Sequence, residues 1–313
     1  DPYDARNKIV ELKPDVLTLD VEMPRMDGVE FLRKLMPQYP LPVIMVSSLT
    51  ERRKQITLQA LEAGALDFVT KPKADMARGL QLLVFELATK IKIASTANVA
   101  HWKHKRPPLA SASAVTGAKA LAESTEKVIA IGASTGGTEA LREVLTKFPA
   151  LAPGTVVVQH MPAGFTKMFA DRLNELCEME VKEAEDGDRI LCGRVLIAPG
   201  GKHMRVVRSG GQYRVEVKAG ELVNGHCPSV EVMMRSVAEH VGPNALGAML
   251  TGMGRDGADA MKMMRDAGAR CIAQDEATSV VFGMPKEAFE RGGAERLVAL
   301  PQIAAALMEM LKR

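Results

Sequence analysis

Residues 128–141 read Val-Ile-Ala-Ile-Gly-Ala-Ser-Thr-Gly-Gly-Thr-Glu-Ala-Leu, and this stretch decides the fold of the second part of the chain. Its apolar opening is short and rich in β-branched residues, which is typical of a parallel strand buried on both faces. Apolar residues then recur at helical spacing: Leu141, Val144, Leu145 and Phe148. Small residues join the two patterns, so the sequence predicts a sharp turn that lifts the Ser134 hydroxyl clear of the backbone.

This turn has three interpretations, namely a nucleophile elbow, a phosphate-binding loop and a serine that only caps a helix. Gly132 and Gly137 occupy the outer positions of a G-x-G-x-x-G pattern, but Ser134 replaces the middle glycine. A dinucleotide site also needs an acidic residue at the end of the next strand. Here the next predicted strand, residues 155–159, is followed by His160. A histidine at that position favours acid–base chemistry.

The chain has 313 residues, 47% of them hydrophobic, and a formal net charge of +3. That length allows two domains with separate cores, and the balanced charge gives no general signal for nucleic-acid binding. No apolar run is long enough to span a membrane and no signal peptide opens the chain, so we expect a cytoplasmic protein without membrane insertion. The cysteines are scattered, without a C-x-x-C pair, which favours neither a disulfide framework nor a zinc site: Cys177, Cys192, Cys227 and Cys271.

Strand and helix patterns alternate in the first part of the chain, which predicts a parallel sheet with helices on both faces. The predicted elements are a helix ending before Lys13, a strand over residues 16–19, a helix with inward Phe31, Leu32, Leu35 and Met36, a strand over 42–46, a helix ending at Ala63, a strand over 67–70 and a helix from about 75 into the nineties.

Three polar residues fall at the carboxyl ends of these strands, where functional groups gather in such sheets: Asp20, Ser47 and Lys71. They offer a carboxylate that could accept a phosphoryl group, a hydroxyl, and an ammonium that could neutralise phosphoryl oxygens. Together with Met23-Pro24, Met26-Asp27-Gly28 and Lys71-Pro72, this pattern resembles the receiver domain of bacterial response regulators. The resemblance implies that a histidine kinase phosphorylates Asp20, with Mg²⁺ bridging.

Receivers begin with a strand that ends in an acidic pair, which helps to hold Mg²⁺. Nothing before Asp20 supplies that strand or that pair, and the first residue is Asp1. We therefore expect the natural start to be missing and residues 1–93 to form an incomplete flavodoxin-like receiver that lacks its first strand. Asp20 is then the remaining expected Mg²⁺ ligand, which puts phosphorylation of this chain in question. Residues 94–127 are basic and then rich in alanine and serine, so we expect a linker there.

Residues 128–313 predict a second, larger α/β domain of doubly wound, Rossmann-like type with a β-hairpin. Its predicted elements after residue 160 are strands over 181–185 and 194–198, a hairpin over 204–217 around Ser209-Gly210-Gly211, a helix with inward Val230, Met233, Met234 and Val237, a strand over 245–250, a glycine-rich turn over 251–257, a strand over 271–274 and a closing helix from Pro301.

Three residues of this domain are expected at the carboxyl ends of apolar strands: Ser134, His160 and Asp256. They match the nucleophile, base and orienting carboxylate of a serine hydrolase. Asp256 could instead bond its own turn, and the competing acids are Asp186, Asp188, Asp259 and Asp275. His226 is the competing imidazole and is expected to contact substrate. The main-chain N–H groups near Thr135 and Met253 could donate to a developing oxyanion.

The motifs of this domain resemble the catalytic domain of the chemotaxis protein-glutamate methylesterases. They are Gly-Ala-Ser-Thr-Gly-Gly-Thr-Glu-Ala over 132–140, Gln-His-Met-Pro over 159–162, Leu-Thr-Gly-Met-Gly-Arg-Asp-Gly over 250–257 and Phe-Gly-Met-Pro over 282–285. The preceding receiver is also what that family carries. The family's catalytic serine, histidine and aspartate fall on Ser134, His160 and Asp256.

The resemblance implies hydrolysis of glutamate γ-methyl esters on chemoreceptors, with release of methanol, and deamidation of certain receptor glutamines. It implies chemoreceptors as substrates, a chemotaxis histidine kinase as phosphodonor, and no cofactor for hydrolysis. In that family the unphosphorylated receiver covers the catalytic face, so phosphorylation of Asp20 is expected to relieve inhibition. The alternatives are a response regulator whose output is binding only, and a nucleotide-binding oxidoreductase.

Overall fold

The computed structural model describes residues 2–48, 50–71, 76–103 and 126–312, and the chain divides into two compact units, residues 1–111 and 112–313. Most of the predicted linker therefore lies outside the described residues. The described start of that segment packs as part of the first unit, because Ala94 and Val99 are buried there. Within the described parts of the chain, no helix is long and apolar enough to cross a membrane.

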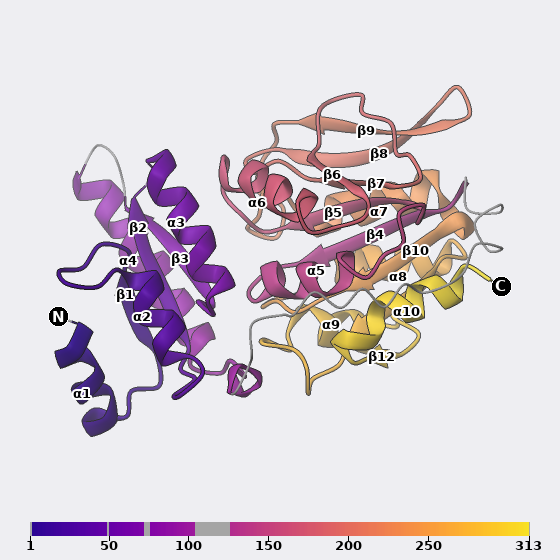
Figure 1. The fold of residues 1–313 in the computed structure, drawn as a ribbon. Coiled ribbons are helices and arrows are strands. Elements are labelled where there is room, and N and C mark those ends of the chain that lie inside the picture. Colours follow the sequence, from indigo (N-terminus) through magenta and orange to yellow (C-terminus); the bar gives the residue numbers. More distant parts are fainter. Residues whose placement is uncertain (1, 49, 72–75, 104–125, 313) are drawn as a thin grey trace. The chain divides into compact units, whose positions relative to one another are not determined.

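The first unit is built on a parallel sheet whose described strands lie in the order β1-β2-β3 (Figure 1). These strands are β1 (Leu17–Asp20), β2 (Val43–Ser48) and β3 (Asp67–Lys71), and the helices are α1 (Pro2–Leu12), α2 (Gly28–Leu35), α3 (Glu51–Glu62) and α4 (Met76–Ala94). The inward residues predicted for α2 are all buried: Phe31, Leu32, Leu35 and Met36. Asp27 caps this helix by accepting a hydrogen bond from the Glu30 N–H at 2.8 Å.

The second unit is organised on a seven-stranded, all-parallel sheet of order β12-β11-β10-β4-β5-β7-β6 (Figure 1). Its strands are β4 (Val128–Ala133), β5 (Gly154–Gln159), β6 (Glu180–Glu183), β7 (Arg194–Ile197), β10 (Ala245–Met249), β11 (Arg270–Gln274) and β12 (Leu297–Val298). Its α-helices are α5 (Gly137–Leu145), α6 (Phe165–Asn174), α7 (Val230–His240), α8 (Ala258–Asp266), α9 (Met284–Glu290) and α10 (Leu300–Met310).

The central strand β4 is buried on both faces, as its apolar sequence predicts. Val128 and Ala130 belong to the core cluster that also contains residues of α7 and α8. Since side chains alternate along a strand, Ile129 and Ile131 point to the opposite face, on the side of α5 and α10 (Figure 1). Two parallel α/β units confirm the predicted fold class.

A two-stranded antiparallel hairpin, β8 (His203–Ser209) and β9 (Gln212–Lys218), completes the second unit. Its turn is Gly210-Gly211, and both glycines have positive φ angles, 57° and 79°. That conformation suits the twist of a two-residue hairpin, which confirms the hairpin predicted at this position. The hairpin packs on α7, where Ser236 Oγ accepts a hydrogen bond from the Val206 N–H at 2.8 Å.

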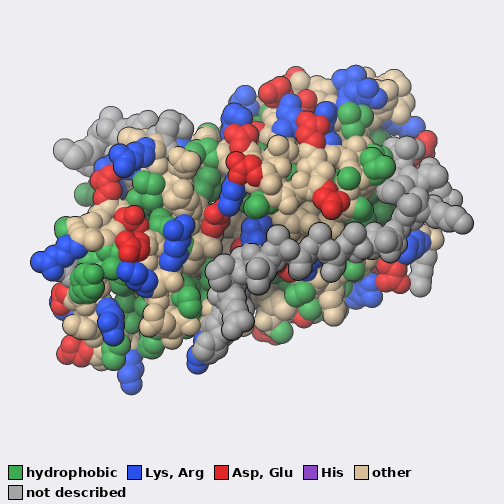
Figure 2. Space-filling view, viewed as in Figure 1, with side chains coloured by type: hydrophobic (Ala, Val, Ile, Leu, Met, Phe, Trp, Pro, Cys, Tyr) green, Lys and Arg blue, Asp and Glu red, His purple; other side chains and the backbone are tan. Residues whose placement is uncertain are grey.

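The visible surface mixes charges of both signs, with basic and acidic side chains interspersed (Figure 2). Ion pairs between residues one helical turn apart include Arg142 with Glu139 and Lys147 with Glu143. Partly exposed pairs of this kind contribute only about 0.3–0.5 kcal/mol each. The stability of the second unit therefore rests on its buried sheet and not on its surface charges.

The contact between Gly132 on β4 and Val230 on α7 gives a test of this packing. A β-carbon built at Gly132 would lie 2.4 Å from Val230 Cγ1. We expect Gly132→Ala to lower the free energy of unfolding by about 1–3 kcal/mol, because the core is overpacked. In the Gly132→Ala/Val230→Ala double variant the cost should be clearly below the sum of the single costs. Denaturant unfolding followed by circular dichroism measures this coupling, and strictly additive costs would contradict the contact.

Candidate active site

Ser134 lies in the turn between β4 and α5, at the carboxyl edge of the central strand. Gly136 has a φ of +77°, and a β-carbon there would lie 2.7 Å from Val280 Cβ, so this position requires glycine. The Gly137 N–H donates to the Ser134 carbonyl at 2.7 Å, and the Ser134 N–H donates to the Thr251 carbonyl at 3.0 Å. The turn is therefore sharp and held on both sides of the serine.

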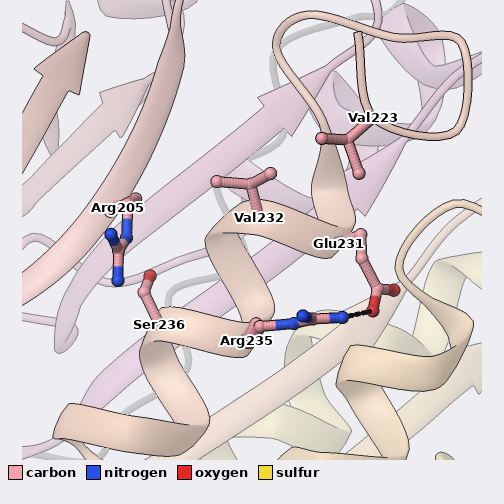
Figure 3. A pocket seen from close by; sticks show the side chains of 6 residues that line it. All are labelled: Arg205, Val223, Glu231, Val232, Arg235 and Ser236. Atoms are coloured by element: carbon pink, nitrogen blue, oxygen red, sulfur yellow. Dashed lines mark hydrogen bonds and ion pairs between the residues drawn. The ribbon is translucent and has the colours of Figure 1, made fainter. Parts of the chain in front are cut away.

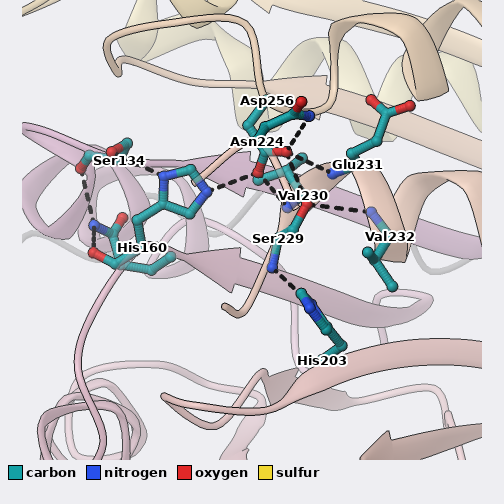
Figure 4. A network of polar contacts seen from close by, with 10 residues as sticks. Ser134, His160, His203, Asn224, Ser229, Val230, Glu231, Val232 and Asp256 are labelled. Carbon is teal, nitrogen blue, oxygen red and sulfur yellow. Dashed lines mark hydrogen bonds and ion pairs between the residues drawn. The ribbon is translucent and has the colours of Figure 1, made fainter. Parts of the chain in front are cut away.

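His160 follows β5, the neighbour of β4, and its side chain is only 7% exposed. Its N–H donates to the Ala133 carbonyl at 3.1 Å, which anchors the histidine beside the end of the serine strand. His160 Nδ1 lies 3.1 Å from Ser134 Oγ (Figure 4). The two residues predicted from consecutive strand ends are thus within hydrogen-bond distance of each other.

Asp256 reaches the same site from the loop between β10 and α8, on the other flank of β4. Its Oδ2 lies 2.8 Å from His160 Nε2 and accepts the Val230 N–H at 2.6 Å. Its Oδ1 accepts hydrogen bonds from Asn224 Nδ2 at 3.0 Å, Ser229 Oγ at 2.7 Å and the Glu231 N–H at 3.3 Å (Figure 4). These bonds tie Asp256 to the start of α7, and the carboxylate does not serve merely to close its own turn.

The hydrogen bonds to Asp256 fix its ionisation and the tautomer of His160. Burial alone would raise the pKa of Asp256, but the bonds from His160, Asn224 and Ser229 outweigh it and lower the pKa from 3.8 to about 2. An ionised carboxylate can only accept, so His160 Nε2 carries the proton that it donates to Asp256. His160 Nδ1 is then the acceptor that faces the hydroxyl of Ser134, which is the arrangement that general-base catalysis needs.

The four competing acids are each held elsewhere. Asp186 accepts the Val217 N–H, Asp188 pairs with Lys182, Asp259 pairs with Arg291, and Asp275 accepts from Thr278. The competing imidazole lies against the site, because the ring of His226 stacks on the ring of His160 with a centroid separation of 3.6 Å and an interplanar angle of 12°. His226 therefore contacts the predicted base directly, a contact that sequence reasoning did not foresee.

The two predicted oxyanion positions differ in their surroundings. Thr135 is buried, and its carbonyl accepts a hydrogen bond from Thr251 Oγ1 at 3.0 Å. Met253 is 48% exposed, and its N–H donates to no acceptor within the described residues. Gly252, the residue before Met253, lies close to the nucleophile, because a β-carbon built at Gly252 would be 2.7 Å from Ser134 Cβ. Among the described residues, no acceptor therefore competes for the Met253 N–H.

Four supporting residues were not singled out from the sequence: Asn224, Ser229, Thr251 and Gln159. Asn224 and Ser229 hold Asp256, the buried Thr251 joins the serine turn to the Val281 loop, and Gln159 Nε2 donates to the Ser134 carbonyl at 2.9 Å. Ser229 carried a usable signal, because a serine before an apolar helical run is a typical N-cap. Asn224, Thr251 and Gln159 act through tertiary contacts, which no local sequence pattern predicts.

The three residues predicted for the phosphorylation site of the first unit, Asp20, Ser47 and Lys71, also lie at one edge of its sheet. Lys71 Nζ forms an ion pair with Asp20, and Ser47 Oγ accepts a hydrogen bond from Thr57 Oγ1 at 2.8 Å. Glu22, close to Asp20 in the chain, pairs with Arg53 at 2.6 Å. Within the described residues no group of three or more histidine, cysteine or acidic side chains could hold a metal ion. These described residues alone do not make a full Mg²⁺ ligand set.

Comparisons with known proteins agree with this arrangement. Residues 129–307 match the CheB methylesterase family, and residues 1–81 match the response regulator receiver domain. The catalytic unit is similar to the crystal structure of the Thermotoga maritima CheB methylesterase catalytic domain, with 38% sequence identity and a TM-score of 0.57 over 59% of this chain and 98% of that chain.

Two curated relatives are similar over nearly the whole chain, and both are named protein-glutamate methylesterase/protein-glutamine glutaminase. The protein from Syntrophotalea carbinolica is 66% identical over 99% of this chain and 88% of its own length. The protein from Salmonella typhimurium is 52% identical over 98% of this chain and 86% of its own length. The chain therefore belongs to the CheB methylesterase family, with a response regulator receiver domain ahead of its catalytic domain.

Proposed function

We propose that this chain hydrolyses glutamate γ-methyl esters on chemoreceptors and deamidates receptor glutamines during chemotactic adaptation. The observation that carries the proposal is the continuous chain of contacts from Ser134 through His160 to Asp256, at 3.1 Å and 2.8 Å. The relatives named for both activities support it at 66% and 52% identity. A serine hydroxyl is a poor nucleophile unless a neighbouring base takes its proton, and this geometry supplies that base.

In the first step, Ser134 Oγ attacks the ester carbonyl while its proton passes to His160 Nδ1. Asp256 stabilises the imidazolium that forms, because its carboxylate already accepts the Nε2–H bond. Main-chain N–H groups of the serine turn and of Met253 would stabilise the oxyanion. The tetrahedral intermediate then collapses, His160 returns its proton to the leaving oxygen, and methanol departs from an acyl-enzyme.

In the second step, His160 Nδ1 takes a proton from water, and the resulting hydroxide attacks the acyl carbon. Collapse of this second intermediate restores the Ser134 hydroxyl with the proton from His160 and releases the glutamate side chain as a carboxylic acid, which loses its proton to water. A glutamine side chain would follow the same path with ammonia as the leaving group. Every bond change uses the substrate, water and the three side chains, so the proposal needs no cofactor for hydrolysis.

The receiver domain supplies the regulatory part of the proposal. Asp20 and Lys71 lie together at the sheet edge, which places an ammonium beside the expected phosphoacceptor. We expect phosphotransfer from a chemotaxis histidine kinase to Asp20, and we expect it to raise the esterase rate. An output limited to binding is not favoured, because it would leave the aligned Ser134, His160 and Asp256 without a use.

The direct test is methanol release from methylated chemoreceptor membranes. We expect Ser134→Ala to lower the rate on the order of 10³-fold or more, because the nucleophile is removed. The matched control is Ser209→Ala, an exposed serine on the hairpin, which should leave the rate unchanged. A small-molecule phosphodonor with Mg²⁺ should raise the rate of the native chain and not that of Asp20→Asn. No release from the folded native chain would overturn the proposal.

A second prediction concerns the pH dependence of stability. Because the pKa of Asp256 is lowered from 3.8 to about 2, its carboxylate stabilises the fold above about pH 4, and this contribution is lost as the pH falls toward 2. It amounts to about 2 kcal/mol. Asp256→Asn lacks it, so the gap in unfolding free energy between native chain and variant should be largest near neutral pH and should narrow as the pH falls below about 4.

Denaturant unfolding over a pH series measures that gap. The control is Asp259→Asn, which removes a carboxylate that is 57% exposed and should cost no more than about 1 kcal/mol at neutral pH. Asp256→Asn should also lower methanol release on the order of 10³-fold or more, because an amide can donate to Nε2 and favour the wrong His160 tautomer. A stability gap that stays constant with pH would contradict the role of the ionised carboxylate.

A third prediction separates two roles for His226. If its stacked ring holds the ring plane of His160, His226→Ala should lower kcat about tenfold, and His226→Phe should retain most of the activity. If His226 instead contacts substrate through its ring nitrogens, both variants should raise KM to a similar extent. Steady-state kinetics on receptor membranes decides between the two. Unchanged kcat and KM in both variants would remove His226 from the site.

A further inference from the structure

Helices α7 and α8 each receive a carboxylate at the N-terminus: α7 from the loop before α8, and α8 from the first turn of α7. Asp256 lies just before α8, and it accepts the N–H groups of Val230 and Glu231, the first two residues of α7. The third N–H of α7, that of Val232, is satisfied by Ser229 Oγ at 3.4 Å. The first N–H groups of a helix have no partner within the helix, so Asp256 supplies what α7 would otherwise lack.

Glu231 returns this contact from the first turn of α7. Its Oε2 accepts the N–H of Ala260, the third residue of α8, at 3.1 Å. Its Oε1 accepts a hydrogen bond from Arg235 Nη2 at 2.9 Å, one turn along α7 (Figure 3). Glu231 is only 4% exposed, so nearly all of its carboxylate is withdrawn from water. A buried carboxylate is costly unless its oxygens are bonded, and here both oxygens have donors.

The proposed mechanism needs the Asp256 carboxylate held against His160, and it does not use Glu231. We propose that Glu231 is a positioning residue for Asp256, acting through the first turn of α8. The Ala260 N–H lies four residues after Asp256, and the single turn that connects them begins α8. Fixing that turn on α7 fixes the loop that carries Asp256. Asp256 in turn fixes the start of α7, which carries Glu231. The contact of Asp256 with α7 and the contact of Glu231 with α8 therefore support each other, and loss of either loosens the other.

The hydrogen bond from the Ala260 N–H to Glu231 contributes more to holding the α8 turn than the ion pair between Glu231 and Arg235 does. Arg235 is 54% exposed and, with Glu231 itself, lines a cavity of about 290 Å³ whose other lining residues are Arg205, Val223, Val232 and Ser236 (Figure 3). Water reaches the guanidinium there, so the Arg235 pair is screened and contributes little. The Ala260 N–H faces a buried oxygen, and removing that acceptor would leave a donor unsatisfied. The amide of a glutamine could replace the acceptor, whereas alanine could not.

The kinetic test rests on the proposed esterase function. In the full chain, Glu231→Ala should lower kcat for methanol release about tenfold with KM changed less than about twofold, since substrate contacts are untouched. Glu231→Gln should restore most of the loss, because its carbonyl oxygen can accept from Ala260. Arg235→Ala should stay within about twofold of the native rate. Equal losses in Glu231→Ala and Arg235→Ala would overturn the proposed route through α8.

A spectroscopic test does not depend on the esterase reaction. The His160 Nε2–H that bonds Asp256 should give a downfield proton signal in the native chain, which the Asp256→Ala variant assigns by its loss. In folded Glu231→Ala this signal should shift or broaden, and in Glu231→Gln it should return. An unchanged signal and an unchanged kcat per folded molecule would show that Glu231 is merely structural. Absence of methanol release from the native chain, with the signal responding as expected, would overturn the esterase and not the positioning.

Discussion

The Asp256 carboxylate is the interaction on which the rest of the catalytic unit depends. A buried anion costs several kcal/mol unless its oxygens are bonded, and five donors surround this one. Two of those donors are the first N–H groups of α7, and one is the ring of His160. The same charge therefore holds a helix in place and sets the tautomer of the catalytic base. Fold and chemistry are coupled at this residue, because any change that neutralises it also weakens its hydrogen bonds to the start of α7.

The sheet explains why serine, histidine and aspartate occur in this order along the chain. Ser134 follows the central strand β4, His160 follows β5 on one flank, and Asp256 follows β10 on the other flank. Parallel strands bring their carboxyl ends to one edge, so residues after three adjacent strands must converge. The chain passes to β5 first and reaches β10 only after the hairpin and α7. The order of the three residues along the chain thus follows from the strand order. The chemistry requires only their arrangement in space.

This convergence is why much of the site could be predicted from sequence. Strand ends are visible in the hydrophobic pattern, and the strand-end rule then places Ser134, His160 and Asp256 together without a structure. The support for Asp256 could not be predicted in the same way. Asn224 lies 32 residues from Asp256 and Ser229 lies 27, and each bond depends on how the loop before α7 folds over the sheet edge. The stack of His226 on His160 could not be predicted for the same reason, because no local sequence pattern indicates that the two rings lie 3.6 Å apart.

The strand positions also account for the choice of ring nitrogen. Nδ1 is the nitrogen nearer the main chain, and the His160 main chain is bonded to Ala133, the residue before the serine. The near nitrogen therefore meets Ser134. Strands β5 and β10 lie two strand spacings apart, roughly 10 Å, so a carboxylate from the β10 side can be reached only by the far nitrogen. The imidazole spans the edge of β4, and a serine on the β10 flank would face the far nitrogen of the same histidine.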